Sequence, residues 1–153
     1  MLNDYEKLMV CLFSDESAVA MTFRNQEIQG RTTGEVPKTR LDSVRRIWHQ
    51  VMPIRQLLTV DHKIQVTVNG SDQAVYNGSQ MSDGERVTFY LIGQVVSAKP
   101  DSIIVIDEPE LHLHKSIQAT LWRAIMDARP DCLFVYMTHD VEFAASLAEA
   151  KKI

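Results

Sequence analysis

Residues 103–109 read Ile-Ile-Val-Ile-Asp-Glu-Pro, and this stretch decides the fold class of the chain. A continuous apolar run of β-branched residues is typical of a short strand that is buried on both faces of a parallel sheet. Pro109 ends the strand because proline has no backbone N–H to donate. Asp107 and Glu108 therefore fall at the carboxyl end of the strand, which is the edge where open α/β sheets bind ligands.

The residues that follow predict a strand–helix–strand unit. Residues 115–128 carry apolar side chains at helical spacing, and residues 132–137 form a second apolar run. A further helix is expected to begin near Asp140. A unit of this length implies parallel strands joined by a right-handed crossover. The carboxyl ends of the two strands then meet at one edge, so His139 is expected to lie beside Glu108.

The side chains at this edge suit phosphate and metal chemistry. Asp107 suits a magnesium site, either directly or through bound water, because hard cations take oxygen ligands. Glu108 suits a base that orients or deprotonates an attacking water, and His139 suits a contact with that water or with a terminal phosphate. The alternative is an acidic turn in solvent with a packed or solvated histidine. The residues by themselves leave both interpretations open.

A helix over residues 83–98 is preceded by Met-Ser-Asp-Gly-Glu-Arg at 81–86. Ser82 and Glu85 have the spacing of a capping box. The start of a helix also presents unpaired N–H groups, and Gly84 would let an anion approach them while the Ser82 hydroxyl donates to a phosphate oxygen. On this motif alone a plain helix cap is favoured over an anion site, and Asp83 opposes simple attraction of an anion.

The first half of the chain is less clear. It predicts a strand over residues 18–23, a loop over 29–37, a helix over about 39–52 and a β-hairpin over about 56–76 that turns at Asn69-Gly70. We therefore expect residues 1–75 to form the N-terminal part of a lobe and residues 76–153 to form its core.

Composition limits the functional classes. The formal net charge of −4 argues against broad coating of nucleic acid. Cys11 and Cys132 lack CxxC spacing, which favours a reduced, cytoplasmic protein. No apolar run approaches the roughly 18 residues that span a bilayer, so no membrane contact is expected. His112 and His114 are two residues apart, which raises the question of a metal site, but no cysteine cluster or HExxH order accompanies them. A loop whose histidines bond to the backbone or lie at an interface is favoured instead.

Taken in order, the sequence MSDGER, a helix, IIVIDEPELHLH, a helix and a strand ending in MTHD resembles the C-terminal half of ABC-type ATPase heads. The resemblance is to the AAA branch that holds the OLD-family, RecF-like and SMC-like ATPases, and it covers about residues 76–147. It implies an α/β fold: a parallel-sheet lobe of the P-loop-NTPase type, half of an ABC ATPase, with an N-terminal helix and a β-hairpin region.

The resemblance also implies roles for particular residues, with ATP and Mg²⁺ as cofactors. Asp107 matches the Walker B aspartate that binds Mg²⁺, Glu108 the catalytic glutamate and His139 the switch histidine. The signature motif, which contacts the γ-phosphate of ATP held by the opposite subunit, is matched by Ser82, Gly84 and Glu85. Residues 110–114 match the D-loop at the dimer interface. Asp83 departs from the more usual glycine of the signature, and Lys115 stands where this branch often has proline.

The phosphate-binding P-loop pattern GxxxxGK[ST] does not occur in these 153 residues. The nearest segment, residues 30–39, has three residues between Gly34 and Lys38, and Pro37 removes an N–H. We therefore expect a C-terminal fragment of an ATP hydrolase that needs an N-terminal P-loop lobe elsewhere and dimerises through an ATP sandwich.

By resemblance alone, the parent protein would act in DNA repair or phage defence with a DNA or nuclease partner. The alternatives are a non-catalytic protein-interaction module and a fragment of the nucleotide-binding subunit of an ABC transporter.

Overall fold

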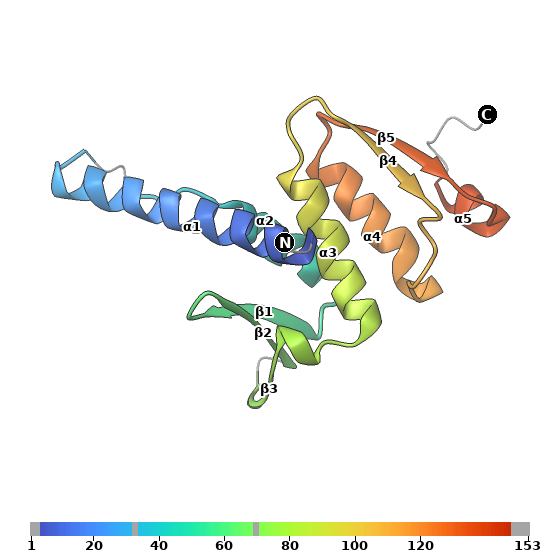
Figure 1. Ribbon diagram of the computed structural model, residues 1–153, viewed down its shortest axis with the longest axis horizontal. Helices are drawn as coiled ribbons and strands as arrows, with labels where there is room; N and C mark the ends of the chain where they lie inside the picture. The colour runs from blue at the N-terminus through green and yellow to red at the C-terminus, as the bar shows by residue number, and fades with distance from the viewer. Residues whose placement is uncertain (1–3, 32–33, 69–70, 148–153) are drawn as a thin grey trace.

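The computed structural model describes residues 4–31, 34–68 and 71–147, and it places a layer of helices between two small sheets (Figure 1). Its elements in chain order are α1 (Asp4–Ile28), α2 (Arg40–Val51), β1 (Arg55–Val60), β2 (Lys63–Val68), β3 (Ser71–Asn77), a 3₁₀ turn (Gly78–Gln80), α3 (Asp83–Ser97), β4 (Ile103–Asp107), α4 (Lys115–Ala128), β5 (Leu133–Met137) and α5 (Val141–Ser146).

The strand expected over residues 18–23 is wrong, because these residues belong to the 25-residue helix α1. A short apolar run does not distinguish strand from helix, and here it lies inside a longer stretch of good helix formers. The helix ends at Ile28, and Gly30 follows it with a φ of 66°, which allows the Arg31 N–H to donate to the Gln26 carbonyl. The buried residues of α1, Leu8 and Leu12, both lie in its first half, and its second half projects from the body (Figure 1).

Helix α2 is the centre of the helical layer. It confirms the helix expected over about 39–52, and Thr39 and Asp42 form a reciprocal capping box at its start. The helix packs against α1, α3, α4 and β1. Its apolar stripe is buried because every third or fourth residue is large and apolar, namely Leu41, Val44, Ile47, Trp48 and Val51.

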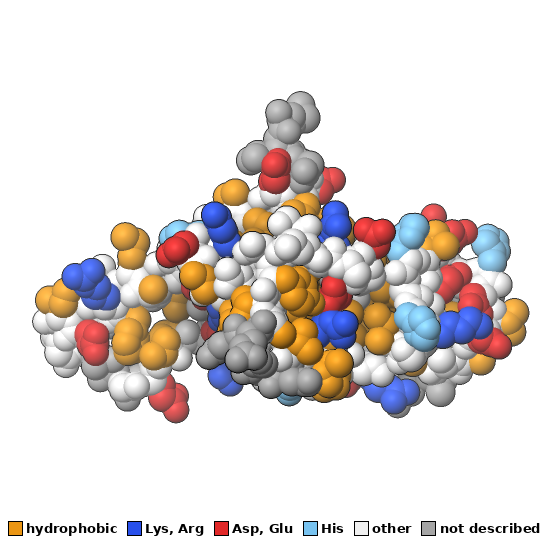
Figure 2. Space-filling model, turned by 90° about the horizontal axis from the view of Figure 1, so that it is seen from below, with side chains coloured by type: hydrophobic (Ala, Val, Ile, Leu, Met, Phe, Trp, Pro, Cys, Tyr) orange, Lys and Arg blue, Asp and Glu red, His pale blue; other side chains and the backbone are white. Residues whose placement is uncertain are grey.

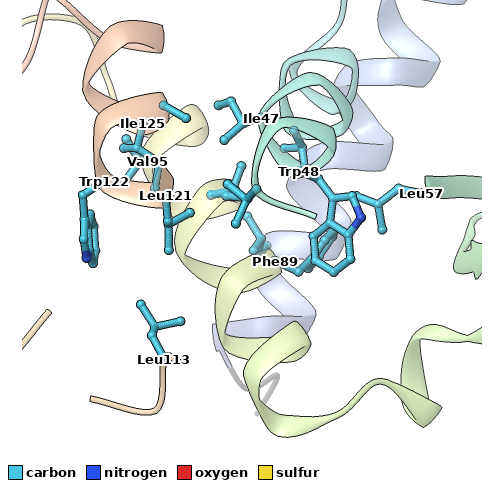
Figure 3. Packing of buried hydrophobic residues seen from close by; sticks show 14 of the residues in the cluster. Ile47, Trp48, Leu57, Phe89, Val95, Leu113, Leu121, Trp122 and Ile125 are labelled. Carbon is cyan, nitrogen blue, oxygen red and sulfur yellow. The ribbon is translucent and has the colours of Figure 1, made fainter. Parts of the chain in front are cut away.

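One cluster of buried side chains joins the helices to the antiparallel sheet (Figure 3). Trp48 lies at its centre, edge-on to Phe89 with ring centroids 6.4 Å apart, and its indole Nε1 donates to the Arg55 carbonyl at 2.9 Å. The cluster draws on both halves of the chain and includes Leu8, Leu12, Leu57, Ile64, Val66, Ile92, Leu121, Trp122 and Ile125.

The antiparallel sheet has the order β1-β2-β3, where a single hairpin over about 56–76 was expected. The turn between β1 and β2 was missed. Asp61 and His62 both have positive φ, 49° and 56°, as a two-residue type I′ turn requires. Neither residue is glycine, so the usual sequence signal is absent. The turn expected at Asn69-Gly70 lies outside the described residues.

Strands β4 and β5 pair in parallel, with α4 as the crossover, as the sequence predicts. The expectation that these strands are buried on both faces is wrong. On one face the side chains are half-buried against the helical layer, including Ile104, Ile106, Phe134 and Tyr136. On the other face the side chains are exposed: Ile103 67%, Val105 58%, Leu133 61%, Val135 39% and Met137 49%. The physical reason is that α4 packs against one side of this sheet, where Trp122 meets Tyr136 with ring centroids 5.4 Å apart. Within the described residues the exposure of the other side shows that no element covers it. We call the exposed side the open face.

Replacing the central indole tests the packing of the core. Trp48→Phe should lower the free energy of unfolding by about 2 kcal/mol, because it removes a buried hydrogen bond and leaves a small void. Urea unfolding followed by circular dichroism measures the change. The neighbouring His49 is exposed, so His49→Ala should change stability by less than about 0.5 kcal/mol. Equal stabilities for the two variants would contradict this description of the core.

Candidate functional site

The carboxyl ends of β4 and β5 lie at one edge of the sheet, as the sequence predicts. Asp107 pairs with Met137 in the parallel register, and the Glu108 N–H donates to the Met137 carbonyl at 2.8 Å. The segments that carry Glu108 and His139 therefore leave the sheet at neighbouring strand ends. Histidine, acidic and basic side chains gather at the end of the molecule that carries this sheet and α5, away from the tip of α1 (Figure 2).

The three edge residues are accessible. Alternation along β4 places Asp107 on the open face with Ile103 and Val105. Asp107 and His139 are exposed and Glu108 is half-buried. Within the described part of the chain, none of the three has a side-chain hydrogen bond or an ion pair. Asp107 and Glu108 carry the carboxylate oxygens that Mg²⁺ prefers as ligands, so the chemistry of these residues fits a magnesium ion.

The loop after β4 has an unusual backbone. Glu108 and His112 both lie in the left-handed region, with φ of 48° and 62°. For residues other than glycine this conformation costs roughly 1–2 kcal/mol each. Strain of this kind persists only where surrounding contacts hold the chain, and it is concentrated at functional sites.

Two buried side chains of α4 supply those contacts. The Trp122 indole donates to the Pro109 carbonyl at 3.2 Å. The Gln118 amide donates to the Glu110 carbonyl at 3.1 Å and to the Leu113 carbonyl at 3.0 Å. The sequence identified Trp122 as a core residue through its spacing, but nothing in its pattern indicated that Gln118 is buried and holds this loop.

His114 has a structural role at the start of α4. Its side chain accepts a hydrogen bond from the Ser116 N–H, and its Nδ1 lies 2.8 Å from the Ser116 hydroxyl. This confirms the backbone-bonding interpretation for His114. Among the described residues there is no group of three histidine, cysteine or acidic side chains that could hold a metal ion.

The start of α3 forms the capping box that the sequence predicts. Ser82 is the N-cap, and its N–H and hydroxyl both donate to Glu85 Oε2 at 2.8 Å. The other oxygen, Oε1, accepts from the Tyr76 hydroxyl and forms an ion pair with Arg55, both at 2.5 Å. Glu85 is 7% exposed. Both oxygens of its carboxylate are thus engaged inside the protein, which does not fit the direct phosphate contact expected for Glu85.

This network sets the ionisation of Glu85. Burial by itself would raise the pKa of the carboxyl, but the hydrogen bonds from Tyr76 and Ser82 and the charge of Arg55 outweigh burial and lower the pKa below its ordinary value. The charged form of Glu85 therefore holds β1, β3 and the first turn of α3 together.

Gly84 brings the helix start next to the loop after β4. A Cβ atom added at Gly84 would lie 3.9 Å from the His112 carbonyl oxygen, which is an ordinary contact. The two segments, which the sequence identified separately, are therefore neighbours in space. The absence of a side chain at Gly84 is therefore not needed to relieve a clash.

A chain from a solved structure concerned with ATP-driven dimerisation and DNA-stimulated activation of SMC ATPases has a similar fold, with a TM-score of 0.53 and 17% identity over 68% of this chain and 69% of that chain. No curated protein matches the chain. Residues 21–145 match the family described as "AAA domain, putative AbiEii toxin, Type IV TA system".

The chain therefore belongs to this AAA family of ATPase-type, ATP-binding domains. Among the helices of the described residues, none has the length and apolar character needed to cross a membrane.

The Glu85 network predicts a pH dependence. A lowered folded-state pKa contributes stability that is fully present above the unfolded pKa of about 4.3 and is lost as pH falls through the folded pKa. Glu85→Gln should cost about 2 kcal/mol at pH 7, because hydrogen bonds to a charged group are lost. The difference from wild type should shrink as pH falls below about 4.3. Urea unfolding at pH 7, 5, 4 and 3 measures it. Glu27→Gln, at an exposed position of α1, serves as the control, and a cost for Glu85→Gln that stayed constant with pH would contradict the assignment.

Proposed function

We propose that this chain is the C-terminal lobe of an ATP-hydrolysing head from the branch that holds the OLD-family, RecF-like and SMC-like ATPases. In this proposal an N-terminal lobe supplies the P-loop and the sheet strands that complete the domain. One observation carries the proposal: Asp107 lies at the carboxyl edge of β4, on the open face, beside exposed apolar residues of both strands.

The open face is unusual for a parallel sheet, because parallel sheets are normally covered on both sides. A two-stranded sheet is also small compared with the four to six strands that are most common. Both features are accounted for if another lobe packs against this sheet. A lobe that covers Ile103, Val105 and Val135 would also bring its ligand-binding loops toward Asp107, where a bound phosphate and its Mg²⁺ are needed.

Each edge residue then has a role. Asp107 would hold Mg²⁺ directly or through its waters, and the ion would supply positive charge to offset that of the phosphates. Glu108 accepts the proton of the attacking water as the γ-phosphoryl group passes to that water, which gives ADP and inorganic phosphate. His139 contacts the terminal phosphate or the water. The strained backbone at Glu108 supports a functional role for that position.

The start of α3 acts on nucleotide held by a second copy, so the active form is a homodimer around ATP. When ATP is bound, the Ser82 hydroxyl exchanges its bond to Glu85 Oε2 for one to the γ-phosphate, while the Ser82 N–H keeps its bond to Glu85. Gly84 lets the phosphate approach the helix N–H groups. Glu85 acts indirectly by holding Ser82 in place, in keeping with its internal contacts. The similar SMC ATPase chain comes from work on ATP-driven dimerisation, which supports this assembly.

Residues 30–39 are a poor substitute for a P-loop, because a P-loop joins a strand to a helix and this segment instead follows helix α1. This supports supply of the P-loop from elsewhere. We extend the proposal to a parent protein that acts in DNA repair or phage defence with a DNA or nuclease partner. That extension is supported by the sequence resemblance and by the DNA stimulation of the related SMC ATPases.

Calorimetric titration with ATP and magnesium tests the proposal. The chain alone should show no binding below the millimolar range, because no P-loop cradles the phosphates. After addition of the P-loop lobe, ATP should be hydrolysed, and Glu108→Gln should lower kcat by about 10²-fold or more while ATP still binds. Glu35→Gln, at an exposed position far from the edge in sequence, should have wild-type activity. Micromolar binding of ATP by the chain alone, or full ATPase activity of Glu108→Gln, would contradict the proposal.

Gly84→Ala separates folding from phosphate binding. The new methyl group meets only an ordinary contact, and alanine is better than glycine within a helix, so stability should be unchanged or rise by up to about 1 kcal/mol. The methyl group should nevertheless crowd the phosphate and lower the ATPase activity of the assembled dimer about tenfold or more, as small misplacements at reacting groups do. Gln94→Ala, at an exposed position of the same helix, is the matched control. Wild-type activity of Gly84→Ala would remove this helix start from the site.

A further inference from the structure

We propose that Glu110 and Thr138 form a latch that positions His139 relative to Glu108. The latch is the hydrogen bond that the Thr138 hydroxyl donates to Glu110 Oε1 at 2.8 Å. Glu110 lies in the loop after β4, and Thr138 is the first residue after β5. This inference rests on the proposed function and adds two positioning residues to it.

The latch joins the two loops that carry the proposed reacting groups. Glu110 is two residues beyond Glu108, and its own carbonyl is held by Gln118 at 3.1 Å. Gln118 thus anchors the loop after β4 to α4. The Glu110 carboxylate accepts a hydrogen bond from Thr138 at the end of the neighbouring strand. Beyond the backbone pairing of Glu108 with Met137, this side-chain bond fixes the distance between the loops.

Thr138 passes the constraint on to His139. Its Oγ1 also accepts a hydrogen bond from the Asp140 N–H at 2.9 Å. The Asp140 carboxylate in turn accepts from the N–H groups of Glu142 and Phe143 and caps α5. His139 therefore stands between two residues that are both tied down, although its own side chain is exposed. Its backbone is fixed while its ring stays free to meet a ligand.

The chemistry of the latch requires a hydroxyl at position 138. A hydroxyl donates and accepts at once, and the latch uses both functions. The second carboxylate oxygen of Glu110, Oε2, is buried and has no partner among the described residues. The Thr138 hydroxyl is therefore the contact that holds this carboxylate. Serine can replace it, whereas valine has the same shape but breaks both bonds.

Nuclear magnetic resonance on the 153-residue chain tests the latch without ATP. In Thr138→Val the Asp140 amide should lose its protection from hydrogen exchange, and the His139 ring resonances should shift. Thr138→Ser should restore both signals. Thr120→Val, at an exposed position of α4, is the matched control and should leave them unchanged. Unchanged Asp140 and His139 signals in a folded Thr138→Val would overturn the latch.

Turnover in the ATPase assembled with its P-loop lobe tests the positioning role. Thr138→Val and Glu110→Ala should lower kcat about tenfold to a hundredfold at an unchanged KM for ATP, because a reacting group is displaced. Thr138→Ser keeps the hydroxyl donor and Glu110→Gln keeps a side-chain oxygen acceptor. Both variants should therefore have most of the wild-type kcat.

The outcomes separate the two proposals. Glu108-dependent hydrolysis with a wild-type kcat for Thr138→Val overturns the latch and leaves the proposed function standing. No hydrolysis by wild type in the assembled protein overturns the proposed function and the positioning role together. A rise in KM with kcat unchanged also overturns the positioning role, since it would place the latch in nucleotide binding.

Discussion

The parallel pairing of β4 with β5 is the constraint on which the rest of the site depends. It places Asp107 opposite Met137 and so brings two loops, about thirty residues apart in the chain, to one edge of the sheet. The crossover helix α4 is needed for parallel pairing, and it also supplies Gln118 and Trp122, which hold the loop after β4. The crossover connection thus fixes the position of Asp107 and Glu108 at the sheet edge and supplies the side chains that hold their loop.

The loop after β4 combines strain with firm anchoring. The left-handed residues Glu108 and His112 raise the free energy of this segment, while hydrogen bonds from α4 and from Thr138 offset that cost. These contacts anchor the backbone of the loop, while the Glu108 side chain is half-buried and that of His112 is exposed. An anchored loop suits the proposed hydrolysis of ATP, since catalysis of phosphoryl transfer depends mainly on positioning and charge.

The start of α3 is both capped and attached to the antiparallel sheet. Ser82 and Glu85 satisfy the capping box, and Glu85 also holds Arg55 and Tyr76, so the helix start is attached to the antiparallel sheet. Gly84 lies beside the His112 carbonyl oxygen, where an added Cβ atom would be 3.9 Å away. The helix cap is therefore present in the structure, and the anion site belongs to the proposed function.

The sequence by itself determined the local elements of the second half: helices α3 and α4, strands β4 and β5, and the acidic pair at a strand end all follow from apolar periodicity, caps and proline. Tertiary structure decided what periodicity does not encode. A short apolar run became part of α1 because its neighbours extend the helix, and Asp61-His62 turned without glycine. The open face exists because the surroundings of a strand, not its residues, decide how many faces are covered. The burial of Gln118, the contacts of Glu85 with Arg55 and Tyr76, and the Glu110–Thr138 bond are visible only in the structure. Burial and partners of polar side chains depend on contacts between distant segments.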